Sequence, residues 1–150
     1  MYVTVTEYQT HATSVGKILP ATEEEQTQQL LQASHFIDAN EGRFKGIRTD
    51  RDQDYAFPRY GFSFQGYSYT SSEVPEIVER LQMELALDIN DDIDIFNREY
   101  NQPITKEKVG PVEVGYASPS STKTITKTTL AERILSQLTS NNFSIPLTRA

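Results

Sequence analysis

The segment between residues 46 and 72 constrains the fold of this chain more than any other. It has neither the spacing of an amphipathic helix nor a clear strand alternation, so it predicts a loop of about 25 residues, a length that is usually functional or disordered. Disorder is disfavoured because seven aromatic side chains lie between Tyr55 and Tyr69, too much apolar surface to leave in water. We therefore expect a loop that packs on the rest of the protein, with a small hairpin around Gln65-Gly66.

Helical periodicity on both sides of this loop predicts a mainly α-helical protein. Thr22 and Glu25 form a capping box for a helix over residues 23–40, and Pro75 stands in the first turn of a helix that runs to about residue 89. A shorter helix is expected over residues 6–15, preceded by a weak strand over residues 1–5. A further helical turn is expected after Ile93, ending before Pro103.

The C-terminal third predicts a different organisation. Residues 104–109 and 112–116 alternate as two strands about Gly110-Pro111, and a hairpin of this kind is marginal alone. A linker rich in Ser, Thr and Lys follows over residues 118–129. Thr129 and Glu132 then form a second capping box, for a short helix that we expect to be detached from the core by the linker.

The predicted architecture is a small helical bundle with a long aromatic-rich loop, a β-hairpin at about residues 104–116 and an extended C-terminal arm. We expect one domain over residues 1–117, because 150 residues with 37% hydrophobic content fit a single core. Residues 118–150 would add the linker, the short helix and a tail. That tail either docks on a partner surface or folds back as a strand on its own domain.

The net charge of −7 is unevenly distributed along the chain. Residues 1–42 carry −5 and residues 73–99 carry −7, whereas residues 43–59 carry +2 and residues 117–150 carry +3. An acidic body with a basic loop and a basic tail suits head-to-tail contact between copies, or an acidic channel, better than wrapping a polyanion. The alternative is that these charge runs are solvated faces without a partner.

The residue content points away from enzymes and cofactors. The chain has no cysteine, which excludes disulfides, thiolate metal sites and a cysteine nucleophile. His11 and His35 stand in no metal-ligand spacing, and neither a phosphate-binding glycine loop nor a nucleophile motif is present. We expect no catalytic, cofactor or metal site. The sequence also shows neither a signal peptide nor an apolar run long enough for a membrane span, so we expect a soluble protein without membrane contact.

One acidic stretch resembles a calcium loop. From Asp88 to Glu99, oxygen ligands fall at the first, third, fifth, seventh and twelfth positions of such a loop. The position that needs glycine for a sharp turn is Ile93, a β-branched residue poorly suited to positive φ. The stretch therefore favours an acidic, solvated helix end over a calcium site.

Several short motifs, in order along the chain, resemble a family of small tailed-phage proteins. The basic run from Arg43 to Thr49 is followed by a spaced acid and amide (Asp50, Gln53) and an aromatic-Pro-Arg motif from Phe57 to Gly61. Further matches are Val74-Pro75, Glu84-Leu85-Ala86-Leu87 and the run from Glu107 to Tyr116. Together these resemble the head-to-tail connector or adaptor (head completion) proteins, a family also labelled DnaT-like single-stranded DNA-binding proteins. The resemblance extends to about residue 116 and departs at Phe57, where the family has Trp, and over residues 118–150.

The resemblance implies a structural virion protein. Such a protein forms a ring with itself, commonly twelvefold, between the portal protein and the tail or nozzle proteins. The ring extends the channel for genomic double-stranded DNA, which passes without sequence-specific binding, and offers a platform for tail attachment. It would be located at the head–tail interface of the virion, and in the host cytoplasm during assembly.

The same resemblance suggests where the contacts lie. Subunit contacts would come from the basic loop and the hairpin: Arg43, Lys45, Arg48, Phe57, Arg59, Val109, Val112 and Val114. Docking on the portal or on a neighbouring subunit would use the apolar side chains of the arm: Leu130, Ile134, Leu138, Phe143, Ile145 and Leu147.

The alternative function is single-stranded DNA binding by the loop over residues 43–69. Its arginines and aromatics are the groups that pair with phosphates and stack on bases. Asp50, Asp52 and Asp54 alternate through the same stretch, however, and the whole chain is acidic. We expect instead that the arginines pair with these acids and pack on the aromatic rings.

Overall fold

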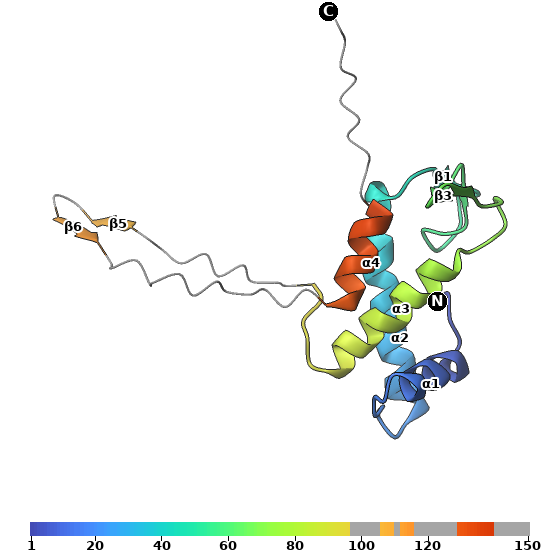
Figure 1. Cartoon of the computed structure of the whole chain (residues 1–150), viewed down its shortest axis with the longest axis horizontal. Helices are drawn as coiled ribbons and strands as arrows, with labels where there is room; N and C mark the ends of the chain where they lie inside the picture. Colours follow the sequence, from blue (N-terminus) through green and yellow to red (C-terminus); the bar gives the residue numbers. More distant parts are fainter. Residues whose placement is uncertain (97–105, 110–111, 116–128, 140–150) are drawn as a thin grey trace, which may run out of the picture.

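The computed structural model describes residues 1–96, 106–109, 112–115 and 129–139. Within these residues four α-helices form the core: α1 (Val5–Ser14), α2 (Glu23–Ala39), α3 (Glu76–Asn90) and α4 (Leu130–Thr139). Figure 1 shows α2, α3 and α4 packed together, with α1 at the end where α2 begins. The mainly α-helical fold with small hairpins, expected from the sequence, is confirmed.

Capping side chains fix where the first two helices begin. At α2 the Thr22 hydroxyl accepts a hydrogen bond from the Glu25 amide, as its capping box predicts. At α1 the Thr4 hydroxyl accepts from the Glu7 amide, and the Glu7 carboxylate accepts from the Thr4 amide at 2.8 Å. The strand expected over residues 1–5 is therefore wrong, because Thr4 and Glu7 form a second capping box that starts the helix at Val5.

A buried glutamine joins the N-terminus to the two central helices. Gln82 of α3 is fully buried; its amide nitrogen donates to the Leu30 carbonyl (2.8 Å) and the Ser34 hydroxyl (3.1 Å) of α2. Its amide oxygen accepts from the Tyr2 backbone N–H at 2.9 Å. Because a buried polar group is costly unless it is hydrogen-bonded, these bonds fix how α2, α3 and the first residues meet.

Helix α4 belongs to the core. Its buried residues, Ala131, Ile134, Leu135 and Leu138, form part of the same apolar cluster as Leu81 and Leu85 of α3. The sequence predicts a helix detached from the domain, and the structure differs because the face of the helix that carries Ile134, Leu135 and Leu138 is buried in the core, with α3 as a neighbour. The predicted boundary at residue 117 thus does not separate α4 from the domain.

The aromatic-rich loop contains two short antiparallel pairs. After a 3₁₀ turn, η1 (Glu41–Arg43), strand β1 (Ile47–Arg48) pairs with β2 (Arg59–Tyr60). Strand β3 (Ser63–Phe64) then pairs with β4 (Tyr67–Ser68) through a turn in which Gln65 and Gly66 both have positive φ. The small hairpin around Gln65-Gly66 is thereby confirmed, and the primed turn geometry explains its position.

The loop is ordered by its aromatic side chains. Phe44, Phe57 and Phe62 are buried, and the Phe57 ring lies 5.2 Å from the Phe44 ring and 5.0 Å from the Phe62 ring, centroid to centroid. The Phe57 and Phe62 rings meet edge-to-face and the Phe44 ring is tilted against Phe57, and together the three rings extend the helical core.

The extra helical turn expected between Ile93 and Pro103 is absent from its described part, which ends at Phe96; the rest lies outside the described residues. Residues 91–96 form a turn and a bend, in which Asp92 has a φ of 59°. Ile95 is buried, and the exposed Phe96 ring meets the Phe36 ring edge-on. No group of three or more His, Asp or Glu that could hold a metal occurs in the described ranges; Glu99, the last position of the calcium-like pattern, lies outside them.

The predicted hairpin near residues 104–116 is present as an antiparallel pair. Strand β5 (Lys106–Val109) pairs with β6 (Val112–Gly115), with Val109 opposite Val112. No helix in the described part of the chain is long and apolar enough to cross a bilayer.

Candidate interaction surface

Two arginines of the basic loop donate hydrogen bonds to acceptors within the protein. The Arg48 guanidinium forms a bidentate ion pair with the Glu41 carboxylate, in which Nε lies 2.8 Å from Oε1. It also donates to the Gln53 carbonyl at 2.9 Å. Arg59 is only 5% exposed and donates to the carbonyls of Lys45, Gly46 and Ala56. Both guanidinium groups therefore support the loop from within and are committed to protein acceptors.

Glu41 is the acid that both arginines share. Its Oε1 lies 3.8 Å from Nη1 of Arg59, and the hydrogen bond from Arg48 lowers the pKa of the Glu41 carboxyl. The sequence predicts that the loop aspartates are the partners of these arginines, but in the structure the partner is Glu41, the first residue of η1. Packing of arginine on an aromatic ring is present as well, because the Arg59 guanidinium lies 5.9 Å from the centroid of Phe57.

A second contact fastens the loop to α2 and the N-terminus. The Tyr2 hydroxyl donates to Oδ1 of Asp38 at 2.7 Å, and the backbone N–H of Ala56 donates to the same oxygen at 2.8 Å. Burial, together with the bond to Asp38, raises the pKa of the Tyr2 phenol well above its usual range. Asp38 thus joins three parts of the chain that are far apart in sequence.

The β1–β2 pair exposes an apolar and an aromatic side chain instead of Arg48 and Arg59. Ile47 and Tyr60 are cross-strand partners on β1 and β2, and each is 67% exposed. Tyr67, on β4, is 74% exposed. Sequence reasoning missed Ile47 and Tyr60, although their positions next to Arg48 and Arg59 follow from strand alternation: one residue of each pair points inward and the other outward.

The five loop residues predicted as subunit contacts differ in their exposure. Arg43 and Lys45 are exposed; Arg43 donates to the side chains of Asn40 and, on α4, Thr139. Arg48 is half-buried, and Phe57 and Arg59 are buried. Of the predicted hairpin contacts Val109, Val112 and Val114, only the backbone pairing is described.

Of the residues predicted to dock the arm, Ile134 and Leu138 are buried in the domain, whereas Leu130 is exposed. Phe143, Ile145 and Leu147 lie outside the described residues.

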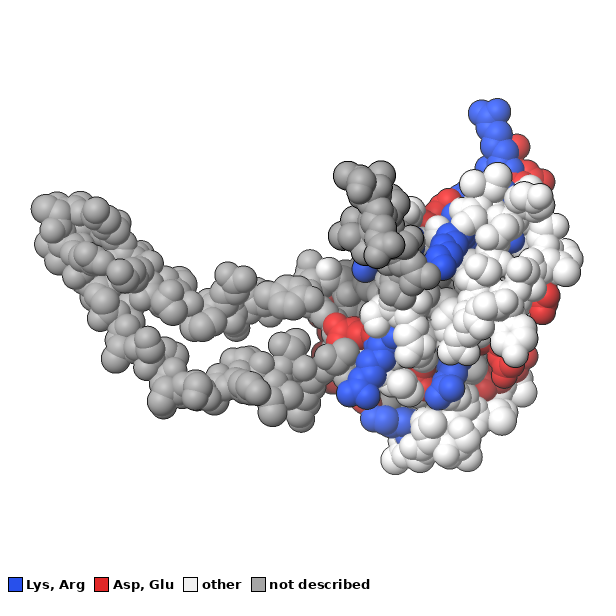
Figure 2. Space-filling model, turned by 45° about the horizontal axis from the view of Figure 1, so that its top comes forward, with Lys and Arg blue, Asp and Glu red and all other residues white. Residues whose placement is uncertain are grey.

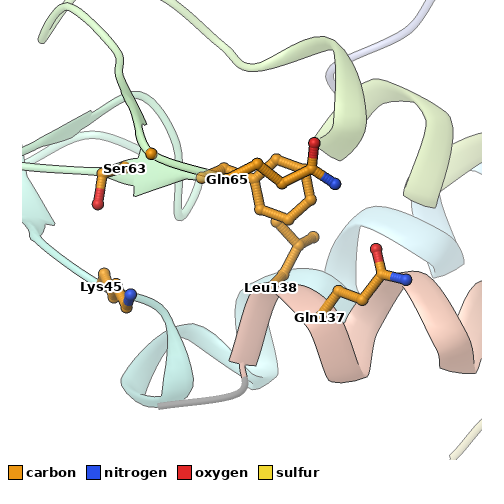
Figure 3. A pocket seen from close by; sticks show the side chains of 7 residues that line it. Lys45, Ser63, Gln65, Gln137 and Leu138 are labelled. Atoms are coloured by element: carbon orange, nitrogen blue, oxygen red, sulfur yellow. The ribbon is translucent and has the colours of Figure 1, made fainter. Parts of the chain in front are cut away.

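A hollow lies between the loop and the end of α4. Figure 3 shows Lys45 on one side, Ser63 and Gln65 from the β3–β4 pair above, and Gln137 and Leu138 from α4 below. Phe64 and Gly66 complete the lining, and the hollow has a volume of about 340 Å³. A second open hollow shares Phe64 and Gln65 with the first, and is also lined by Tyr67, Tyr69 and, from α3, Glu76 and Arg80. The β3–β4 hairpin therefore contributes to two hollows, one lined by Lys45 and the other by Arg80.

Charge on the surface is mixed. On the face shown in Figure 2, Lys and Arg side chains are separated by uncharged surface, and Asp and Glu gather mainly toward the edge. No continuous basic groove is visible on that face, as binding along a nucleic-acid backbone would require.

Comparison with protein families identifies the family of this chain. A model of the family described as "Putative DnaT-like ssDNA binding protein" matches residues 1–150. The chain belongs to this family. The match spans the whole chain, including residues 118–150, where the sequence motifs show no resemblance. No curated protein and no solved structure matches the DnaT-like chain.

Proposed function

We propose that this DnaT-like family member is a structural virion protein that forms a ring between the portal and the tail of a tailed phage. The ring would extend the DNA channel and provide a platform for tail attachment. The motifs from Arg43 to Tyr116 motivate this proposal through their resemblance to connector proteins. This proposed role requires neither enzymatic activity nor a cofactor.

The observation that carries the proposal is the internal use of Arg48 and Arg59. A loop that binds DNA needs guanidinium groups free for phosphates, but those of Arg48 and Arg59 hold the loop in one shape, which leaves Arg43 and Arg51 exposed. What this shaped loop offers outward is the exposed pair Ile47 and Tyr60, the kind of aromatic and aliphatic surface that protein interfaces use. The acidic total charge of −7 disfavours long-range attraction of a polyanion.

The decisive experiment measures the molar mass of the complexes that the protein forms. The purified protein is analysed by light scattering alone and after mixing with the portal protein of the same phage. We expect a stoichiometric ring on the portal, whether or not the protein is monomeric alone. A mixture that shows no stable complex at micromolar concentrations would refute the connector function.

The second candidate function is single-stranded DNA binding, which the description of the family favours. Arg48 and Arg59 are committed to protein acceptors, whereas Arg43 and Arg51 of the same loop are exposed. The β3–β4 hairpin adds the exposed Tyr67, which could stack on a base in the hollow that Arg80 lines. Glu76 in the same hollow opposes a phosphate there.

A binding titration distinguishes the two functions. Fluorescence anisotropy of a labelled oligo-dT is measured with the wild type, Tyr67→Ala and Arg80→Ala at several salt concentrations. Tight binding with a steep salt slope, lost in both variants, would establish the second function and sink the first. We expect weak binding that neither variant changes.

A further inference from the structure

A groove between α1 and α3 has the composition of a docking site. It has a volume of about 640 Å³, within the roughly 300–1,000 Å³ range of protein ligand sites. The exposed Val15 and the half-buried Met83 supply apolar lining, while Glu7, Glu76 and Glu79 supply carboxylates. The groove therefore suits an apolar group that carries or adjoins a positive charge.

The carboxylates of this groove crowd one another. Burial raises the pKa of Glu79, and the nearby charges of Glu7 and Glu76 raise it further. Arg80 is the cation that lines the same groove. An incoming cation would relieve the repulsion among the three acids.

The opposite end of the molecule carries a matching projection. Ile47 and Tyr60 stand side by side on β1 and β2, two residues from the exposed Lys45. Their backbone is held by Arg59 from behind and by Gly46, where a Cβ would overlap the Tyr60 carbonyl oxygen. A rigid apolar pair beside an ammonium group is complementary to an apolar groove rimmed by carboxylates.

We propose that the α1–α3 groove receives the Ile47–Tyr60 pair of a second copy of this chain. In this contact the Lys45 ammonium meets the carboxylates of Glu76 and Glu79, and the Tyr60 hydroxyl donates to the same rim. The contact rests on the proposed ring, because it specifies which two surfaces of neighbouring subunits meet.

The positions of the two surfaces make the contact intermolecular. Figure 1 shows β1 beyond the C-terminal end of α2 and α1 beside its N-terminal end, so the pair of one chain does not reach its own groove. A contact between two different patches is heterologous, and repeated contacts of this kind generate rings when the rotation closes.

Cross-linking tests the contact directly, since the natural chain contains no cysteine. Tyr60→Cys and Val15→Cys variants are mixed, with portal and without it at high protein concentration, and treated with a short bismaleimide. We expect covalent dimers from this pair and a ladder from the double variant. The control pair uses Ile18→Cys, a position that is 90% exposed and does not line the groove.

The outcomes separate the contact from the function. A ring on the portal without the 60–15 cross-link, or with equal yield in the Ile18 control, refutes the contact and leaves the ring. A 60–15 cross-link that forms without portal and is lost when portal is added would show that the portal occupies the groove instead. If neither ring nor cross-link forms under either condition, both the contact and the proposed function are wrong.

A charge exchange gives an independent measurement. Glu79→Lys is expected to weaken association about tenfold or more, as is Lys45→Glu, and the double variant is expected to recover most of the loss. Circular dichroism of each variant confirms that the helices are intact. Two single-variant losses that simply add in the double variant would refute the contact.

Discussion

Gly46 shows at the residue scale how the loop keeps its shape. Its φ is +77°, and a Cβ there would overlap the Tyr60 carbonyl oxygen across the β1–β2 pair. Gly46→Ala should therefore lower the free energy of unfolding by roughly 1–3 kcal/mol, measured by urea denaturation. The matched control is Gly42→Ala, where a Cβ meets nothing within 4 Å and the change should stay within about 0.5 kcal/mol. Equal midpoints for the two variants would contradict the role of Gly46.

Glu41 makes the stability of the loop depend on pH. Because its bond with Arg48 lowers its folded-state pKa below the usual 4.5, protonation favours the unfolded state. The stability that Glu41 contributes is complete above pH 4.5 and is lost as the pH falls through the folded-state pKa. Glu41→Gln should cost about 1 kcal/mol at pH 7 and flatten the acid side of the stability curve. The exposed loop residue Asp52, changed to Asn, serves as control, and thermal unfolding between neutral and acid pH gives both curves; parallel curves for Glu41→Gln and wild type would refute the assignment.

At the scale of elements, local signals predicted more than long-range ones. The helices α2 and α3 begin and end within one or two residues of their predicted bounds, because capping and apolar spacing are written in neighbouring residues. The Gln65-Gly66 turn was predictable for the same reason. The sequence could not show that Arg48 and Arg59 share Glu41, or that Asp38 binds Tyr2 and Ala56, because these partners are brought together only by the fold.

Helix α4 tests the packing of elements. Ile134 is buried against the core, so Ile134→Asp places a charge in apolar surroundings and should cost about 3–5 kcal/mol. Ser136, two residues further on, is exposed, and Ser136→Asp should change stability by less than about 0.5 kcal/mol. Chemical denaturation of both variants measures the difference. An Ile134→Asp protein as stable as the control would mean that α4 is detached, as its linker first suggests.

At the scale of the whole molecule, burial of α4 makes part of the C-terminal arm necessary for the stability of the domain. The helix buries three large apolar side chains, Ile134, Leu135 and Leu138, each worth about 1.5–3 kcal/mol. Their sum is comparable with the total stability of a small domain, about 5–15 kcal/mol. The arm is therefore in part a component of the domain, which the sequence could not show because it places α4 after a long linker.

Two truncations separate folding from docking. A chain ending at Ala117 lacks α4 and should lose its cooperative thermal transition, because the covered face of α3 becomes exposed. A chain ending at Thr139 keeps α4 and should melt within a few degrees of the full chain, since a change below about 1 kcal/mol shifts the midpoint by only 2–8 °C. It lacks Phe143, Ile145 and Leu147, so if this folded chain no longer binds the portal protein, docking is assigned to the tail. If the chain ending at Ala117 still unfolds sharply at the same temperature, α4 is not part of the domain. In that case the chain ending at Ala117 is the valid test of docking.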